Sequence, residues 1–277
     1  MTSSTWPAPA SQHEIVEADL NQLAQRYPAL RELAGLYSEI QEVVRCLGEP
    51  LTARLAQLAE LERAGLDAGR PLLTFADLPI RSERLAEAAH RVSDILSKYD
   101  VQSEAPAGEA LSTEALWALA QEGYEAGAGP ADPPFAGSHL RQAAGQALAG
   151  ALQNAAADGL PAGVAEWWYR GYCPICGGRP DLGLLEADTG RRMLACARCD
   201  TLWPYRRVGC PFCGDDEHIQ HFISPDERFR LSYCRACRKY LKQARWPAGD
   251  APQSLLGLRI FLVGLDLDAQ SLPDQPA

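Results

Sequence analysis

Eight of the nine cysteines in this 277-residue chain stand in four Cys-x-x-Cys pairs, and this pattern constrains the fold more than any other feature. Nineteen residues separate the first pair from the second, and twenty separate the third from the fourth. Both intervals fit the pattern in which two such pairs bind one tetrahedral metal ion. The pairs are Cys173/Cys176, Cys196/Cys199, Cys210/Cys213 and Cys234/Cys237.

The pattern occurs twice, because Cys-Pro-Ile-Cys-Gly at 173–177 returns as Cys-Pro-Phe-Cys-Gly at 210–214. Two thiolates two residues apart can face one ion from a single tight turn, and Gly177 and Gly214 supply the positive φ that such a turn needs. We therefore predict two tandem four-cysteine ribbons, at 166–208 and 209–246, each formed by consecutive pairs. An interleaved arrangement, first pair with third and second with fourth, stays open. Redox pairs without metal are disfavoured, because the accompanying βαβ pattern is missing.

Four sulfurs fill a tetrahedron and leave no position for a substrate water, so the predicted sites are structural or electron-transferring. Sulfur-only ligands suit zinc, a single iron or an iron–sulfur cluster, and the spacing does not separate these. Between Glu166 and Arg245 there are 14 Lys and Arg against 10 Asp and Glu, whereas the rest of the chain has 12 against 26. This basic excess is placed to offset the charge of the thiolates. The overall net charge of −10 argues against a general nucleic-acid binder.

Residues 1–165 predict a bundle of about six helices. Apolar residues recur at steps of three and four over 30–47, 51–61 and 85–99, and the stretches 109–126 and 139–157 are rich in alanine. The loop 127–137 contains Pro130, Pro133 and Pro134 and is expected to be non-helical. The remaining residues, 247–277, form a tail in which 258–267 fits a strand or a short helix equally well.

Membrane insertion is not expected, because the most apolar stretch, 255–267, is short and is interrupted by Arg259. The first twenty residues carry acidic side chains where a signal peptide would be apolar, so the sequence predicts a cytoplasmic protein. Thiols are kept reduced in that compartment, which favours metal ligands over disulfides.

Other candidate residues carry less information. No nucleophile with its base, phosphate loop or carboxylate pair stands out, so an enzyme is not predicted. Cys46 is expected to be a buried small hydrophobe, and His218 and His221 are expected beside the metal sites rather than in them. A set of aromatic residues is expected to shield the first metal or to dock its ribbon onto the bundle. These residues are Trp167, Trp168, Tyr169, Tyr172, Trp203 and Tyr205.

Four segments carry a family resemblance, and they span about seventy residues of the chain. They read YCPICGG at 172–178, CARCDTLW at 196–203, RVGCPFCG at 207–214 and YCRACRKYLK at 233–242. Together they resemble the formate dehydrogenase accessory proteins, the FdhE family. The helical half agrees with that family in type and length, and the tail resembles it least.

This resemblance implies a cytoplasmic, non-catalytic accessory factor that is required for maturation or activity of respiratory formate dehydrogenase and binds its catalytic subunit. The implied fold is α plus small β, an N-terminal helical bundle followed by two tandem rubredoxin or zinc-ribbon-like modules. The eight paired cysteines would hold two metal ions. Iron is favoured by the resemblance, and zinc stays compatible because Asp200 and Arg238 stand where a full rubredoxin turn has glycine. Trp203 and Arg207 are candidates for contact with the partner.

Two alternative functions remain at this point. A zinc-ribbon nucleic-acid-binding protein would show salt-dependent binding to DNA or RNA, although no nucleic acid is expected as partner. A rubredoxin-like electron carrier would hold iron that is reversibly reduced by one electron. Under each hypothesis, replacing Cys173 or Cys210 with serine is expected to unfold only its own ribbon, with the helical half surviving.

Overall fold

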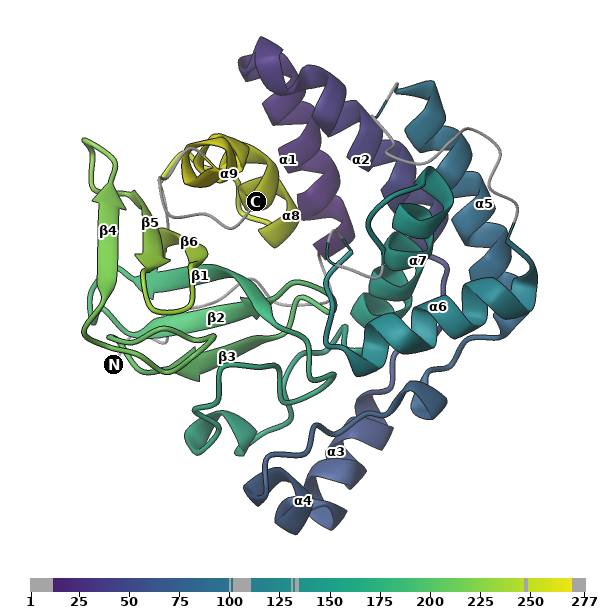
Figure 1. Ribbon diagram of the computed structural model, residues 1–277, viewed down its shortest axis with the longest axis horizontal. Coiled ribbons are helices and arrows are strands. Elements are labelled where there is room, and N and C mark those ends of the chain that lie inside the picture. The colour runs from purple at the N-terminus through teal and green to yellow at the C-terminus, as the bar shows by residue number, and fades with distance from the viewer. Residues whose placement is uncertain are drawn as a thin grey trace.

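Seven α-helices precede the cysteine-rich region in the computed structural model, which describes residues 12–99, 101, 111–130, 132, 135–246 and 249–270 (Figure 1). The expected number was about six. The additional helix arises because the backbone leaves helical geometry at Glu62, which divides the predicted 51–61 segment and its continuation into α3 and α4. The helices are α1 (Gln12–Arg26), α2 (Arg31–Val44), α3 (Thr52–Leu61), α4 (Arg63–Asp67), α5 (Ser82–Lys98), α6 (Thr113–Glu125) and α7 (His139–Ala155).

Small residues let these helices approach closely. At Gly150 of α7, an added Cβ would lie only 2.4 Å from the Cβ of Val44 on α2, and at Gly123 of α6 it would lie 2.1 Å from the Phe135 ring. Serine side chains cap the N-termini of α6 and α7. The hydroxyl oxygen of Ser112 accepts a hydrogen bond from the backbone N–H of Ala115, and that of Ser138 accepts one from the backbone N–H of Arg141. The glycines of α6 and α7 therefore allow neighbouring elements to pack closely against these helices.

Cys46 differs from its prediction. Helix α2 ends at Val44, two residues before Cys46, so this thiol lies in the following turn and is exposed rather than buried. The apolar periodicity continues through Leu47, which is buried, but the helix does not.

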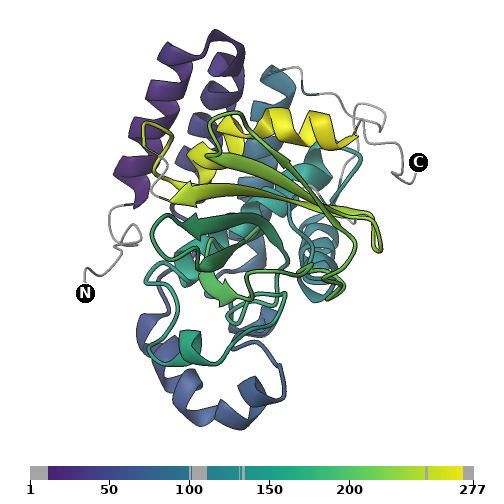
Figure 2. The same ribbon diagram turned by 90° about the vertical axis from the view of Figure 1, so that its left-hand side faces the viewer.

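The cysteine-rich region forms a single six-stranded sheet with the order β3-β2-β1-β6-β5-β4 (Figure 2). Strands β1 to β3 belong to the first predicted module and β4 to β6 to the second. Strands β1 and β6 pair in parallel, with Leu182 opposite Lys242, and all other neighbours pair antiparallel. The two repeats therefore share one sheet. The strands are β1 (Pro180–Glu186), β2 (Arg192–Cys196), β3 (Leu202–Tyr205), β4 (Ile219–Ile223), β5 (Phe229–Cys234) and β6 (Lys239–Trp246).

The tail is helical, which decides between the two alternatives left by the sequence. Helices α8 (Leu255–Phe261) and α9 (Val263–Gln270) follow β6. Leu255 and Leu258 of α8 pack on one face of the sheet, against Leu182 and Ala244. No helix among the described residues is long and apolar enough to cross a membrane. Residues 271–277, like Pro133 and Pro134, lie outside the described residues.

Helix α1 is joined directly to α8 and to the two residues that precede it. The buried carboxylate of Asp19 on α1 accepts hydrogen bonds from the backbone N–H groups of Gln253, at 3.1 Å, and Ser254, at 2.6 Å. Leu20 and Leu23 of α1 also pack with Ile260 of α8. The carboxylate lies at the N-terminus of α8, where negative charge is favourable.

Candidate metal centres

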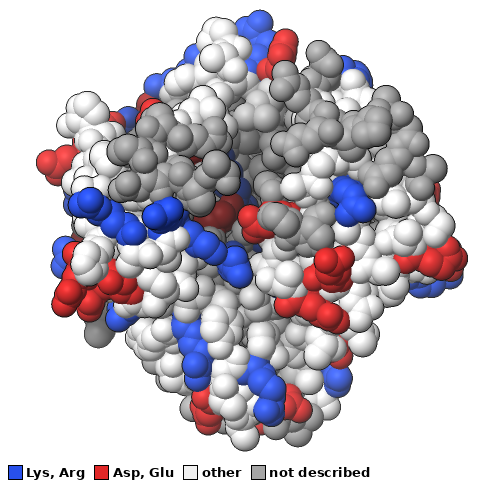
Figure 3. Space-filling model, in the orientation of Figure 1, with Lys and Arg blue, Asp and Glu red and all other residues white. Residues whose placement is uncertain are grey.

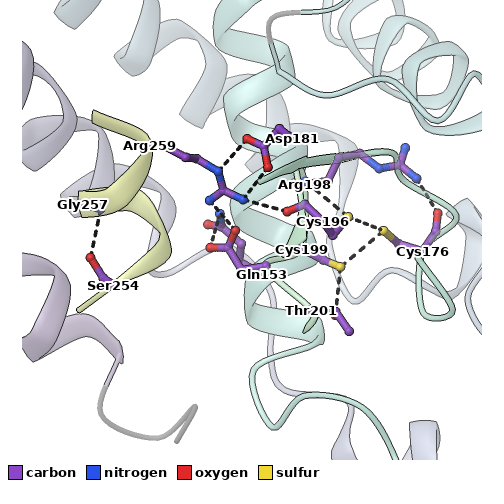
Figure 4. Close-up of polar contacts among 11 residues, drawn as sticks. Gln153, Cys176, Asp181, Cys196, Arg198, Cys199, Thr201, Ser254, Gly257 and Arg259 are labelled. Carbon is purple, nitrogen blue, oxygen red and sulfur yellow. Dashed lines mark hydrogen bonds and ion pairs between the residues drawn. The ribbon is translucent and has the colours of Figure 1, made fainter. Parts of the chain in front are cut away.

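The first four paired cysteines gather their sulfurs between the helices and the sheet. Figure 4 shows three of them, Cys176, Cys196 and Cys199. The Sγ atom of Cys176 lies 3.5 Å from that of Cys196 and 3.4 Å from that of Cys199, and the Sγ atoms of Cys173 and Cys199 are 3.5 Å apart. All four side chains are buried. Cys173 and Cys176 precede β1, Cys196 ends β2, and Cys199 lies in the turn to β3.

The other four cysteines form a second cluster, which is more open. The Sγ atoms of Cys210 and Cys237 are 3.6 Å apart, and those of Cys213 and Cys234 are 3.7 Å apart. Cys210 and Cys234 are buried, whereas Cys237 is partly exposed and Cys213 is exposed. This cluster lies on the loop between β3 and β4 and at the turn between β5 and β6.

Both clusters have the dimensions of a site for one ion. Metal–sulfur bonds of about 2.3 Å give a tetrahedron with sulfur–sulfur edges of about 3.8 Å. The measured separations of 3.4 to 3.7 Å approach this value, and they are far longer than a disulfide bond of about 2.05 Å. Consecutive pairs come together in each cluster, and the interleaved arrangement does not occur. His218 and His221 lie outside both clusters, bonded to Asp215 and Ser232 respectively.

All four cysteine turns end in a left-handed residue. Gly177 and Gly214 have φ of 74° and 84°, and Asp200 and Arg238 have φ of 58° and 59°. Asp200 and Arg238 therefore adopt the same left-handed backbone conformation as the glycines that follow Cys176 and Cys213. A non-glycine residue in this region carries conformational strain of about 1–2 kcal/mol, so neighbouring contacts have to hold the turn.

The first cluster is part of the main hydrophobic core. Its cysteines share one cluster of buried side chains with α2, α5, α6 and α7. The backbone N–H groups of Leu72 and Leu73 donate to the carbonyls of Pro174 and Ile175, at 2.9 and 2.8 Å, which fastens the first cysteine turn to the bundle. The structure therefore changes the expectation that the helical half is independent of this ribbon.

Arg198 supports the first cluster from between its third and fourth cysteines. Its side chain is 1% exposed, and it donates to the carbonyl oxygens of Tyr124, at 2.9 Å, and Cys176. Burial opposes its charge, but the neighbouring sulfurs of Cys176 and Cys196 raise the pKa of Arg198, so it remains a cation. A positive charge beside four thiolates reduces their mutual repulsion.

Arg259 on α8 contacts the first cluster from the opposite side, and the sequence analysis did not identify it (Figure 4). Its guanidinium donates to both oxygens of Asp181, at 2.7 and 3.1 Å, to Asp200, at 2.6 Å, and to the carbonyl of Cys196, at 2.9 Å. Gln153 of α7 also donates to Asp200, at 3.1 Å. The signal in the sequence was the single positive charge in the apolar stretch 255–267, because a buried arginine requires an acidic partner.

The aromatic residues divide between core and surface. Trp168 and Trp203 are almost fully buried, and their indole N–H groups donate to the carbonyls of Tyr172 and Arg170. Tyr172 in turn donates to the carbonyl of Gly69, which docks the ribbon onto the bundle. Trp203 is therefore unavailable to a partner in this conformation, whereas Arg207 is exposed on the loop before Cys210. Tyr169 is 56% exposed.

A cavity of about 580 Å³ lies between the helical bundle and the sheet. Helices α2 and α7 form one wall, and β1, β6, α8 and α9 form the other; Figure 3 shows the hollow near the centre of this face. Ion pairs neutralise its floor, because Lys242 lies 2.6 Å from Asp266 and Arg259 lies 2.7 Å from Asp181. The apolar part of the lining includes Val263 of α9 together with side chains of α8 and α2.

Three exposed cations remain at the rim of this cavity, namely Arg179, Arg238 and Lys239. None of them has a carboxylate partner within the described ranges. Lys239 lies over the ring of Phe212, which also lines the cavity, with its Nζ atom 5.5 Å from the ring centroid. The cavity borders the first cluster at Ala197 and Arg259. It also reaches the second cluster, because Phe212 lies between Cys210 and Cys213 in the sequence.

Comparisons with known proteins agree on one family. Residues 172–207 match the model of the FdhE central domain. An FdhE homolog from Aquifex aeolicus is 35% identical over 83 residues, which are 28% of this chain and 29% of that protein. The FdhE protein of Escherichia coli O127:H6 is 34% identical over 77 residues, which are 26% of this chain and 25% of that protein. The matched segments thus span less than a third of these relatives.

The fold agrees over nearly the whole chain with a crystal structure of the FdhE protein from Pseudomonas aeruginosa. The TM-score is 0.60 at 24% identity, and the match covers 96% of this chain and 93% of that one. The combination of helices with a sheet is therefore the fold of that structure. The resemblance to the FdhE family that the sequence predicted is confirmed.

Proposed function

We propose, from the resemblance to the FdhE family as premise, that this chain is a non-catalytic cytoplasmic accessory factor for respiratory formate dehydrogenase. It binds the catalytic subunit during maturation, and its two four-cysteine clusters each hold one metal ion. The observation that carries the proposal is the FdhE central-domain match at 172–207, which contains the complete first cluster. The domain division at 165, 208 and 246 remains part of the proposal.

The eight cysteines supply the ligands in this proposal, because two closed sets of four thiols fit zinc or iron with no open position. Bound iron would supply a one-electron couple, and bound zinc would supply only structure. The chain itself positions the sulfurs and, at the first cluster, excludes water and balances charge through Arg198.

We place the contact with the catalytic subunit at the 580 Å³ cavity and its rim. Three features support this position. The cavity joins both halves of the molecule, its wall is apolar in part, and Arg179, Arg238 and Lys239 at its mouth have no acidic partner in the part of the chain that the structure describes. A segment of the subunit with acidic and apolar side chains would complement it.

The test is co-purification of the tagged chain with the catalytic subunit, together with formate dehydrogenase activity in a deletion strain. The doubly charge-reversed variant Arg238→Glu/Lys239→Glu is expected to lose association and complementation. Arg191→Glu, an exposed residue on the turn between β1 and β2, serves as the matched control and should keep both. Absence of association together with full activity in the deletion strain would reject the accessory role.

Electron transfer is a second candidate, and the exposure of Cys213 favours it, because an electron carrier needs one edge of its site near the surface. In this case the second cluster would hold iron. Anaerobically purified protein should then show ferric–thiolate absorption after mild oxidation, and the absorption should disappear reversibly on one-electron reduction. Two colourless zinc ions per chain would exclude this candidate.

A further inference from the structure

A stripe of polar side chains crosses the sheet on the face opposite α8 and α9. Lys242 and Ala244 of β6 face the tail helices, so Gln243 between them lies on the other face of the sheet. On β2, Met193 faces the tail helices, so its neighbour Arg192 lies on the same face as Gln243. Three members of the stripe are strongly buried, since Arg192 is 4%, Ser232 8% and Gln243 0% exposed. The stripe consists of Arg192, Gln243, Arg230, Ser232 and His221.

Hydrogen bonds join this stripe but do not satisfy it. Arg230 donates through Nη2 to Gln243 at 3.0 Å, Gln243 donates to the hydroxyl of Ser232, and that hydroxyl lies 2.8 Å from Nδ1 of His221. Arg192 donates through Nη1 to the carbonyl of Gly209 at 2.9 Å. The Nε–H groups of Arg192 and Arg230 are both buried and have no hydrogen-bond partner among the described residues. A buried charged donor without an acceptor costs free energy, so an acceptor placed beside either group would stabilise the stripe.

The stripe contains cations but no carboxylate among the described residues. Burial, and then the charge of Arg230, lowers the pKa of Arg192 to about 10. Burial lowers the pKa of His221, with further contributions from Arg230 and Arg192. Buried like charges of this kind persist in proteins when an opposite charge accompanies them.

The sulfurs of the second cluster supply only part of that opposite charge. Cys210 lies with Arg192 at one small cavity, and its charge opposes the lowering of the pKa of Arg192 without reversing it. No cysteine sulfur accepts a hydrogen bond from either Nε–H group. Neutralising the cluster therefore does not account for these two donors.

A small cavity of about 10 Å³ lies at this stripe, lined by Arg192, Arg207, His221 and Ser232 and by the ligand Cys210. This volume is about one water position, so it admits the end of an anion rather than a large molecule. Arg207 is exposed at its opening. A guanidinium presents its N–H groups in a plane that matches the two oxygens of a carboxylate.

We propose that this stripe is a carboxylate-binding site next to the second cysteine cluster. The carboxylate comes either from a small acid or from an acidic side chain of a bound protein. Arg192 binds its oxygens through its Nε–H group, Arg230 adds positive charge from β5, and Arg207 attracts it at the opening. The inference does not depend on the formate dehydrogenase partner, so its failure would leave the proposed function untouched.

The experiment uses the full zinc-loaded chain labelled with ¹⁵N and follows the arginine Nε–H resonances. Sodium acetate is titrated against sodium chloride at constant ionic strength, and N-acetylglutamate amide is titrated against its glutamine analogue. Two arginine Nε–H resonances are expected to shift and saturate with the carboxylates only. Saturation with acetate indicates a small acid, and saturation with the glutamate compound alone indicates an acidic side chain.

Variants connect the binding to these residues. Arg207→Gln, at the exposed opening, should fold normally and weaken carboxylate binding about tenfold. Arg192→Gln should abolish it, and Arg245→Gln, an exposed arginine on β6 outside the cavity, should leave it unchanged. Equal, unsaturable changes with acetate and chloride, or unchanged binding in Arg207→Gln, would overturn the inference.

Discussion

The two cysteine clusters are copies of one sequence module in different surroundings. In the first, all four sulfurs are buried within the main core, and Arg198 and Arg259 bond to the cysteine turns from two sides. In the second, Cys213 is exposed and Cys237 is partly exposed. The same four ligands at nearly the same spacing thus produce one cluster that is part of the core and one that borders on solvent. The surroundings, not the motif, determine what a metal bound at each cluster would do for the chain.

The largest expected difference is between serine variants of the two clusters. Cys173→Ser should destabilise the whole chain by more than about 4 kcal/mol, because it removes a ligand inside the shared core. Cys210→Ser should disturb only the region around β4 to β6 and leave the helices folded. Circular dichroism at 222 nm during heating distinguishes these cases. Similar loss of helix in both variants would show that the clusters are equivalent.

Breaking the contacts of Arg259 should weaken the first cluster selectively. Arg259→Met leaves Asp181 and Asp200 without their buried cation, which costs about 3–5 kcal/mol. We expect a lower midpoint in urea and earlier metal loss from the first cluster. Arg228→Met provides the comparison, since the ion pairs of Arg228 with Asp226 and Asp250 are exposed and contribute little. Equal effects of the two variants would contradict the role of Arg259.

The left-handed residues Asp200 and Arg238 allow a matched pair of glycine substitutions. Asp200→Gly should cost about 2 kcal/mol, because the carboxylate bonded to Arg259 and Gln153 is lost. Arg238→Gly should change stability by less than about 1 kcal/mol, since relief of backbone strain offsets the added chain flexibility. Urea unfolding curves measure both. A large loss in Arg238→Gly would indicate that this exposed side chain has an unrecognised contact.

The two clusters are expected to lose their metal ions at different rates. A chelator is expected to take the ion of the second cluster about tenfold faster or more, because this cluster opens without disturbing the core. In the metal-free site, burial raises the pKa of Cys213. Hydrogen bonds with the backbone of Asp215 and with the neighbouring sulfurs lower it by more, so the pKa of this thiol is below its ordinary value. Mass spectrometry after brief alkylation should therefore find Cys213 labelled first among the eight cluster cysteines, with the exposed Cys46 counted separately. Simultaneous release of both ions would remove the distinction.

The sequence predicted the parts of the molecule that depend on local spacing. The consecutive pairing of cysteines, the amphipathic helices over 31–44 and 82–98, and the non-helical segment near Pro130 all follow from residues close together in the chain. The prediction for Cys46 was wrong because apolar periodicity does not reveal where a helix ends.

The relations missed by the sequence analysis are long-range. The parallel pairing of Leu182 with Lys242 joins the two repeats, and the contacts of Arg259 join the tail to the first cluster. Neither relation leaves a local pattern, because each depends on how separate segments pack. For Trp203 the sequence offered both a shielding or docking role and a contact with the partner, and its buried position fits the first and excludes the second in this conformation.

The position of Arg259 in the chain also has a consequence for the order of events during translation. Cys199 is synthesised sixty residues before Arg259, so the first cluster has all its sulfurs while α8 has not yet left the ribosome. An ion that enters during this interval meets a site still open on the side that α8 later covers. The ion would then bind before α8 covers the first cluster. In the finished chain α8 would have to move before that ion could leave, so its release would be slow.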